Sequence, residues 1–90
     1  MSGATFKYRG VVTEGGVRYT YYSSNVLRHS LISQWVTDSE GFWRTKNGYY
    51  VVAANSSEYS YGSVISTPWG KAKVLDSGCA AGTIDFYVSW

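Results

Sequence analysis

The fold of this 90-residue chain is decided by the stretch Asp76-Ser-Gly-Cys-Ala-Ala-Gly-Thr-Ile-Asp85-Phe-Tyr-Val88. Strand-forming residues lead into its first acid, as Lys73-Val74-Leu75, and follow its second, as Phe86-Tyr87-Val88. The small, glycine-rich segment between the two acids has no room for a helix, so the two strands are expected to turn tightly there. We therefore expect the carboxylates of Asp76 and Asp85 to lie in one neighbourhood.

Two interpretations of this pair of carboxylates are open. In the first, they form the acid pair of a glycosidase, in which two carboxyl groups flank the bond that is cut. In the second, Asp76 hydrogen-bonds turn amides and Asp85 pairs with a lysine or arginine, so that both are structural. Spacing alone favours the structural interpretation.

The rest of the chain reads mainly as short strands separated by turns. Strands are expected at residues 5–12, 17–23, 49–54, 62–66, 71–75 and 84–89, with Glu14-Gly15-Gly16 as the hairpin turn between the first two. A short helix fits only in residues 25–35, and the polar segment 37–48 is expected to be an insertion. Because a flat sheet of about six strands would leave long edges exposed, we predict a closed small barrel. Residues 1–90 are expected to form one all-β domain.

Composition narrows the classes of partner. Nine tyrosines and four tryptophans exceed what so small a core can bury. Aromatic side chains in excess commonly line grooves for sugars, peptides or bases, because their faces stack while their polar edges hydrogen-bond. The net charge of +2 comes from scattered residues, whereas nucleic-acid binding shows as a concentrated basic stripe, so no nucleic-acid partner is expected. A weakly basic protein would still be attracted to an anionic cell wall.

Cys79 is the only cysteine and His29 the only histidine. A cysteine hydrolase built on these two is an alternative, but nothing in their spacing joins them, and a half-buried, unreactive thiol is the simpler interpretation. One cysteine and one histidine do not make a zinc site, and we expect no metal or other cofactor.

The sequence contains no signal peptide and no apolar run of membrane-spanning length. We therefore expect no insertion into a membrane, and export, if any, by another route. Phage-encoded wall proteins, which leave with a holin or travel on a tail, suit this pattern, as does a fragment of a longer exported protein.

The same C-terminal stretch carries a resemblance to a known family. Asp76-Ser-Gly followed by Gly82-Thr-Ile-Asp85-Phe-Tyr resembles the signature of the 3D domain, which is named for its three aspartates. The preceding strands of that family are similar to segments that occur here in the same order: Tyr19-Thr-Tyr-Tyr-Ser23, Gly48-Tyr-Tyr-Val-Val-Ala-Ala54, Tyr61-Gly-Ser-Val-Ile65 and Gly70-Lys-Ala-Lys-Val74. The resemblance covers most of residues 17–90, with a gap between about 26 and 47.

This resemblance implies a six-stranded double-psi β-barrel and a lytic transglycosylase that cuts the glycan strand of peptidoglycan, at the cell wall or on a virion. Asp76 or Asp85 would be the acid/base, with the other tuning it, and the sequence does not decide which. The candidates for stacking on sugars are Tyr21, Tyr22, Trp43 and Trp69.

The chain departs from the family pattern in two places. Asn55-Ser-Ser stands where the family has its first aspartate, with Glu58 as the nearest acid, and the link between the last two aspartates is short and contains Cys79. A non-catalytic carbohydrate-binding or structural module, for example of a phage tail, is therefore the alternative function.

Overall fold

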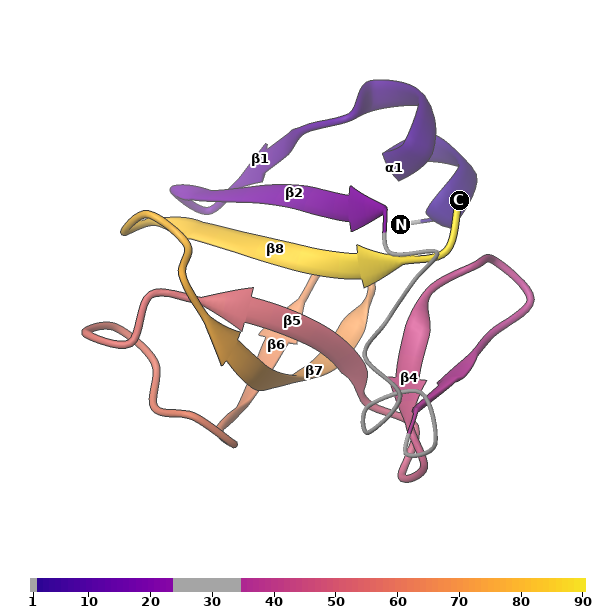
Figure 1. Cartoon of the computed structure of the whole chain (residues 1–90). Coiled ribbons are helices and arrows are strands. Elements are labelled where there is room, and N and C mark those ends of the chain that lie inside the picture. The colour runs from indigo at the N-terminus through magenta and orange to yellow at the C-terminus, as the bar shows by residue number, and fades with distance from the viewer. Residues whose placement is uncertain (1, 24–34) are drawn as a thin grey trace.

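The computed structural model describes residues 2–23 and 35–90, and within them one short helix precedes eight strands (Figure 1). The expectation of a mostly β domain with one short helix is confirmed for these residues. In chain order the elements are α1 (Gly3–Arg9), β1 (Val12–Glu14), β2 (Val17–Ser23), β3 (Trp35–Thr37), β4 (Trp43–Thr45), β5 (Tyr50–Ala54), β6 (Val64–Thr67), β7 (Gly70–Ser77) and β8 (Thr83–Val88).

Four strands form the middle of the sheet, in the spatial order β2, β8, β5, β7. β2 runs parallel to β8, β8 runs antiparallel to β5, and β5 runs parallel to β7. Figure 1 shows the C-terminal β8 inserted between β2 and β5, which are far apart in the sequence. The end of the chain therefore completes the centre of the sheet.

The prediction of a closed six-stranded barrel is wrong, because the sheet does not close and the described residues contain eight strands. The path ends at β1, which pairs with β2, and at β3, which pairs with β4, while β6 pairs with β7. The barrel is predicted because a flat sheet would expose long edge strands. The edge strands β1 and β3 have only three residues each, so the exposed edges are short without closure.

The strand expected at residues 5–12 is also wrong, because most of it is helix α1. Ser2 caps this helix by accepting a hydrogen bond from the Thr5 N–H at 3.2 Å, and Gly10 ends it with φ of 77°. Within the helix, Phe6 is buried whereas Tyr8, two residues on, is 92% exposed. The alternation that predicts a strand is therefore accidental.

The other strand predictions are confirmed to within a few residues, at β2, β5, β6, β7 and β8. The glycines of the predicted β1–β2 hairpin turn have φ of 60° and 80°, which is the geometry that a tight hairpin requires. The helix proposed for residues 25–35 falls almost entirely outside the described residues, and Trp35 begins β3.

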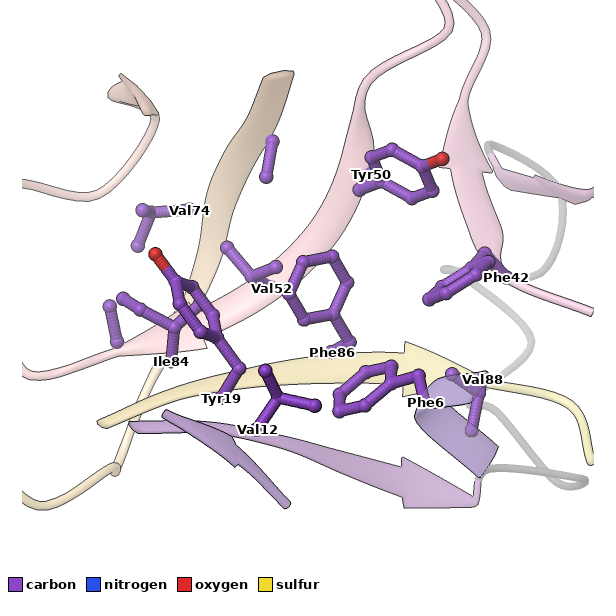
Figure 2. Close-up of a cluster of buried hydrophobic side chains, with 12 residues drawn as sticks. Phe6, Val12, Tyr19, Phe42, Tyr50, Val52, Val74, Ile84, Phe86 and Val88 are labelled. Atoms are coloured by element: carbon purple, nitrogen blue, oxygen red, sulfur yellow. The ribbon is translucent and has the colours of Figure 1, made fainter. Parts of the chain in front are cut away.

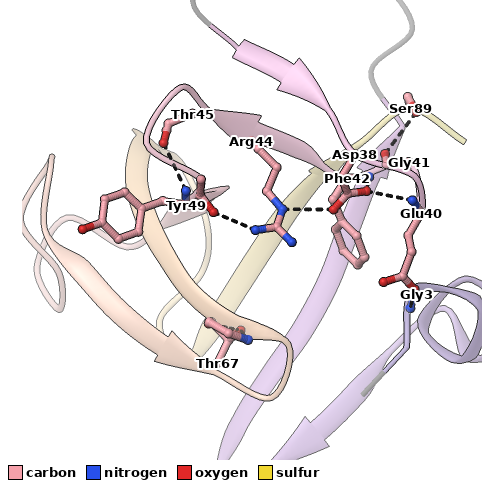
Figure 3. Close-up of polar contacts among 12 residues, drawn as sticks. Gly3, Asp38, Glu40, Gly41, Phe42, Arg44, Thr45, Tyr49, Thr67 and Ser89 are labelled. Carbon is pink, nitrogen blue, oxygen red and sulfur yellow. Dashed lines mark hydrogen bonds and ion pairs between the residues drawn. The ribbon is translucent and has the colours of Figure 1, made fainter.

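The segment 37–48, predicted to be an insertion, contains most of the β3–β4 hairpin (Figure 3). Asp38 organises its turn: Oδ1 accepts the N–H groups of Glu40 and Phe42, and Oδ2 pairs with Arg44 Nε at 3.0 Å. The Arg44 guanidinium also lies 3.7 Å from the centre of the Tyr50 ring on β5. These contacts give Asp38 and Arg44 structural roles.

The main core lies on one face of the sheet (Figure 2) and consists largely of aromatic and β-branched residues. Phe6 from α1 enters this core, and its ring lies 5.5 Å from that of Phe86 on β8. A smaller cluster on the opposite face combines buried Trp35 and Val51 with partly buried Trp43, Leu75 and Tyr87. One face of the sheet is thus covered by the main core, and the other face is covered only in part by the smaller cluster. Among the described residues, no helix is long and apolar enough to cross a membrane.

Candidate functional site

The structure brings the two acids together on the less covered face of the sheet. Asp85 on β8 and Asp76 on β7 are both register partners of Ala53 on the intervening strand β5, and Thr20 on β2 is the partner of Asp85. Two strand spacings of about 4.8 Å separate the backbones of the two acids by roughly 10 Å. Ala53, which lies between them on β5, carries only a methyl group.

A β-bulge decides the face on which Asp76 lies. Val74 is buried in the main core, so regular alternation would turn Leu75 outward and Asp76 into the core. The pairing of β5 with β7 instead shifts between Val52 and Ala53, so that Val52 pairs with Val74 and Ala53 with Asp76. The extra residue, Leu75, puts Asp76 on the same face as Asp85. Bulges are over-represented next to active sites, where they redirect a side chain.

Asp85 is the more enclosed of the two acids. Its side chain is half-buried, and the Thr20 hydroxyl donates a hydrogen bond to its Oδ1 at 2.7 Å. Burial raises the pKa of the Asp85 carboxyl above its ordinary value; the Thr20 hydrogen bond opposes this, and the Asp76 charge adds to it. The Asp85 carboxyl is therefore better able to hold a proton than an aspartate in water.

Asp76 is exposed, yet both of its carboxylate oxygens have hydrogen-bond donors. Oδ1 accepts the Ser77 N–H at 2.8 Å, and Oδ2 accepts the hydroxyl of Tyr87. Burial raises the pKa of the Tyr87 hydroxyl far above its ordinary value, and the hydrogen bond to Asp76 and the nearby negative charges add to this. Tyr87 is thus a neutral donor at any physiological pH.

The loop between β7 and β8 is tied down by the residues that follow β5. Asn55 donates from Nδ2 to the Cys79 carbonyl at 3.1 Å, and Glu58 accepts the Gly82 N–H at 2.7 Å. An aspartate at position 55 could not donate this bond when ionised. Asn55 and Glu58 therefore both have structural roles in holding this loop.

The Cys79 thiol is not an activated nucleophile. Burial raises its pKa, and the charge of Asp85 raises it further, against a hydrogen bond from the Asp85 backbone that lowers it. A reactive cysteine needs a depressed pKa, because the thiolate is the attacking species. His29, the imidazole that a cysteine hydrolase would require, lies outside the described residues.

We expect alkylation of Cys79 by iodoacetamide to be at least about tenfold slower at pH 7 than at pH 9, because little thiolate exists at the lower pH. The rate is measured by intact mass, with glutathione as the reference thiol. Reaction at pH 6 faster than that of glutathione would identify a thiolate and revive the cysteine hydrolase. Cys79→Ser should in addition leave any glycan cleavage largely intact.

Two of the four predicted sugar-stacking residues, Tyr21 and Trp69, are partly buried and pack against the main core. The Tyr21 ring is 5.2 Å from Phe6, and its hydroxyl donates to the Lys7 carbonyl at 3.1 Å. Trp69 is 4.3 Å from the same Phe6 ring and donates from Nε1 to the Ser2 carbonyl at 3.3 Å. Both hold helix α1 against the sheet, on the face opposite to the acids.

The other two lie on the face that carries the acids. Tyr22 is 58% exposed and is the register partner of Tyr87, whose ring centre is 5.9 Å away. Trp43 is partly buried in the smaller cluster beside Trp35 and Val51. Tyr22 is therefore the stacking candidate that combines an exposed side chain with a place on the acid face, two residues along β2 from Thr20.

The sequence pattern does not single out Thr20 or Tyr87. A signal for Tyr87 exists, since residues two apart on a strand share a face and Tyr87 follows Asp85 by two. For Thr20 no such signal exists, because its pairing with Asp85 depends on the register between strands at opposite ends of the chain. In residues 2–23 and 35–90, no group of three or more His, Cys, Asp or Glu side chains could hold a metal ion.

Comparison with known proteins finds no family model that matches this chain, and no similar curated protein or solved structure.

Proposed function

We propose that this chain cleaves the glycan strand of peptidoglycan as a lytic transglycosylase, with Asp85 as the acid/base and Asp76 as the charge that tunes it. The observation that carries the proposal is the bulge at Leu75, which turns an acid out of the core and toward a second, half-buried acid. In the structural interpretation, Asp85 would pair with a lysine or arginine. Within residues 2–23 and 35–90, its hydrogen-bond partner is instead the neutral hydroxyl of Thr20.

The proposed reaction needs one carboxyl group that gives and then takes back a proton. Asp85, protonated when substrate arrives, donates its proton to the glycosidic oxygen as the bond from that oxygen to C1 breaks. The 6-hydroxyl of the same sugar then attacks C1, and its proton passes to the Asp85 carboxylate. The product is a 1,6-anhydro sugar, and Asp85 returns to its starting state without consuming water.

Two further features support a glycan as the substrate. The exposed ring of Tyr22 lies on the acid face, about two strand residues from Asp85, or roughly 7 Å along the strand. A tyrosine in this place can stack on a sugar next to the cleaved bond. The resemblance of the segment around Asp76 and Asp85 to 3D domains points to peptidoglycan among glycans, and hence to the cell wall or a virion as the place of action.

Incubation of the protein with purified peptidoglycan sacculi tests the proposal. Mass spectrometry of the released muropeptides should show 1,6-anhydromuramyl ends, and the Asp85→Asn variant should release almost none. Products with ordinary reducing ends would indicate that water attacks C1, which would make the protein a hydrolase. Absence of any cleavage by the unmodified protein would contradict the enzymatic proposal.

A carbohydrate-binding module is the second candidate, and Asn55 favours it. The amide that replaces the first aspartate of the 3D pattern is committed to the loop: Nδ2 donates to Cys79, and Oδ1 accepts the Ser57 N–H at 2.9 Å. Such a protein would sediment with sacculi without releasing muropeptides. Its binding would weaken on Tyr22→Ala and remain on Asp85→Asn.

A further inference from the structure

We infer that Tyr87 is a positioning residue: together with the Ser77 amide, its hydroxyl holds the Asp76 carboxylate toward Asp85, across Ala53. This inference deepens the proposed function and rests on it for the role of Asp85 as the acid. Its spacing of two residues from Asp85 puts Tyr87 on the acid face, but its role emerges only from the hydrogen bond and register of the folded sheet.

The first support is the contrast between the exposure of Asp76 and its bonding. An exposed aspartate ordinarily exchanges rotamers in solvent within nanoseconds, which averages its charge over many directions. Here one oxygen is held by a backbone amide of its own strand and the other by a side chain of β8, eleven residues further on. The second bond is the one that ties the carboxylate to the strand carrying Asp85.

The second support is the fixed ring of Tyr87. Its centre lies 5.7 Å from that of Trp35 at an interplanar angle of 71°, and 5.9 Å from that of Tyr22. The edge-to-face contact with Trp35 and the tilted contact with Tyr22 restrict the ring without engaging its hydroxyl. The ring of Tyr87 is therefore held by packing while its neutral hydroxyl donates to Asp76. A lysine or arginine in this place would add a positive charge next to the two acids.

The consequence falls on Asp85. Among the described residues, the titratable groups coupled to it are Asp76 from β7, Tyr87 from its own strand and Cys79 from the connecting loop, and the Thr20 hydroxyl on β2 is its hydrogen-bond partner. Among them, Asp76 supplies the negative charge that helps to keep Asp85 protonated. Release of Asp76 into solvent would weaken this effect because water screens the charge.

Tyr87→Phe tests the inference, because it removes the hydroxyl and keeps the ring. The titration of the Asp85 carboxyl carbon, followed by NMR, should move to lower pH, and activity on the alkaline side should fall roughly two- to fivefold, as expected when less of the acid is protonated. Asp76→Asn should move the titration further in the same direction. In the Asp76→Asn background, Tyr87→Phe should have no additional effect, because the two groups act as one unit.

Tyr22→Phe is the matched control, since it removes the hydroxyl of the neighbouring tyrosine and should leave the titration of Asp85 unchanged. An unchanged Asp85 titration in Tyr87→Phe overturns the inference, as does a shift of equal size in the Asp76→Asn background. In a third outcome, Tyr87→Phe shifts the Asp85 titration only when Asp76 is intact, but no variant releases anhydro products. That outcome supports the positioning of Asp76 and contradicts the transglycosylase proposal. The NMR titration thus separates the two failures.

Discussion

Asp85→Asn should lower the release of anhydro-muropeptides by roughly 10² to 10⁴-fold, the range expected when a general acid is removed. An asparagine has the same shape and can still accept the hydrogen bond from Thr20, but it has no proton to donate to the glycosidic oxygen. The measurement is the initial rate of product release from sacculi at a fixed enzyme concentration. A rate within about threefold of the unmodified protein would remove Asp85 from the acid/base role.

Asp76→Asn is the matched variant, and it should behave differently. It removes the negative charge that helps to raise the pKa of Asp85, so that Asp85 loses its proton at lower pH and the alkaline limb of the activity profile moves downward. Activity at the new optimum should fall less than in Asp85→Asn. Profiles between about pH 4 and pH 8 bracket the pKa values of tuned carboxyl groups. Full activity of both variants would overturn the transglycosylase proposal.

Loss of activity in Asp85→Asn is informative only if the variant is folded, and the raised pKa predicts how its stability depends on pH. In the unfolded chain Asp85 ionises at its ordinary, lower pKa, so between that value and the raised folded value the unfolded state binds fewer protons. The stability of the unmodified protein therefore falls across this interval as pH rises. Asp85→Asn removes this loss of stability because asparagine does not ionise, so the melting temperature of the variant should equal or exceed that of the unmodified protein at pH 7. The gain should vanish below the unfolded pKa.

The limits of prediction from sequence are clearest at Asp76. Its proximity to Asp85 follows from the short glycine-rich link, but alternation from buried Val74 places it on the core face. The bulge at Leu75 turns Asp76 to the opposite face, and the bulge can be recognised only from the pairing of β5 with β7. A partner strand more than twenty residues away thus decides which way the acid points.

The N-terminal segment and the β3–β4 hairpin show two other limits. Residues 5–12 alternate as a strand would, and the choice of helix depends on Ser2 as cap and on Phe6 packing against distant rings. The sequence predicts an insertion here because the strands have only three residues each and the turn between them is polar. That turn is built by one side chain, Asp38, which bonds two backbone amides and Arg44. In both cases local propensity is weak and tertiary contacts decide.

Phe86→Ala should destabilise the protein by about 3–5 kcal/mol, the usual cost of deleting a buried phenylalanine ring. Phe86 is fully buried on β8, and its ring lies within 4.9 to 6.3 Å, centre to centre, of five others: Phe6, Tyr19, Phe42, Tyr50 and Trp69. Small domains have only about 5–15 kcal/mol of stability, so this variant should lose a large part of it. Denaturant unfolding gives the difference directly.

Val64→Ala is the control for this variant, because Val64 lies on β6 and is 46% exposed, so its truncation should cost less than about 1 kcal/mol. Phe86 stands between Asp85 and Tyr87, and alternation turns it to the core while they face the site. Asp85→Asn and Phe86→Ala should therefore differ in kind: the first removes catalysis and keeps stability, and the second removes stability and, in the fraction still folded, keeps catalysis. A Phe86→Ala cost below about 1 kcal/mol would mean that β8 presents its other face to the core, which would also remove Asp85 from its place opposite Asp76.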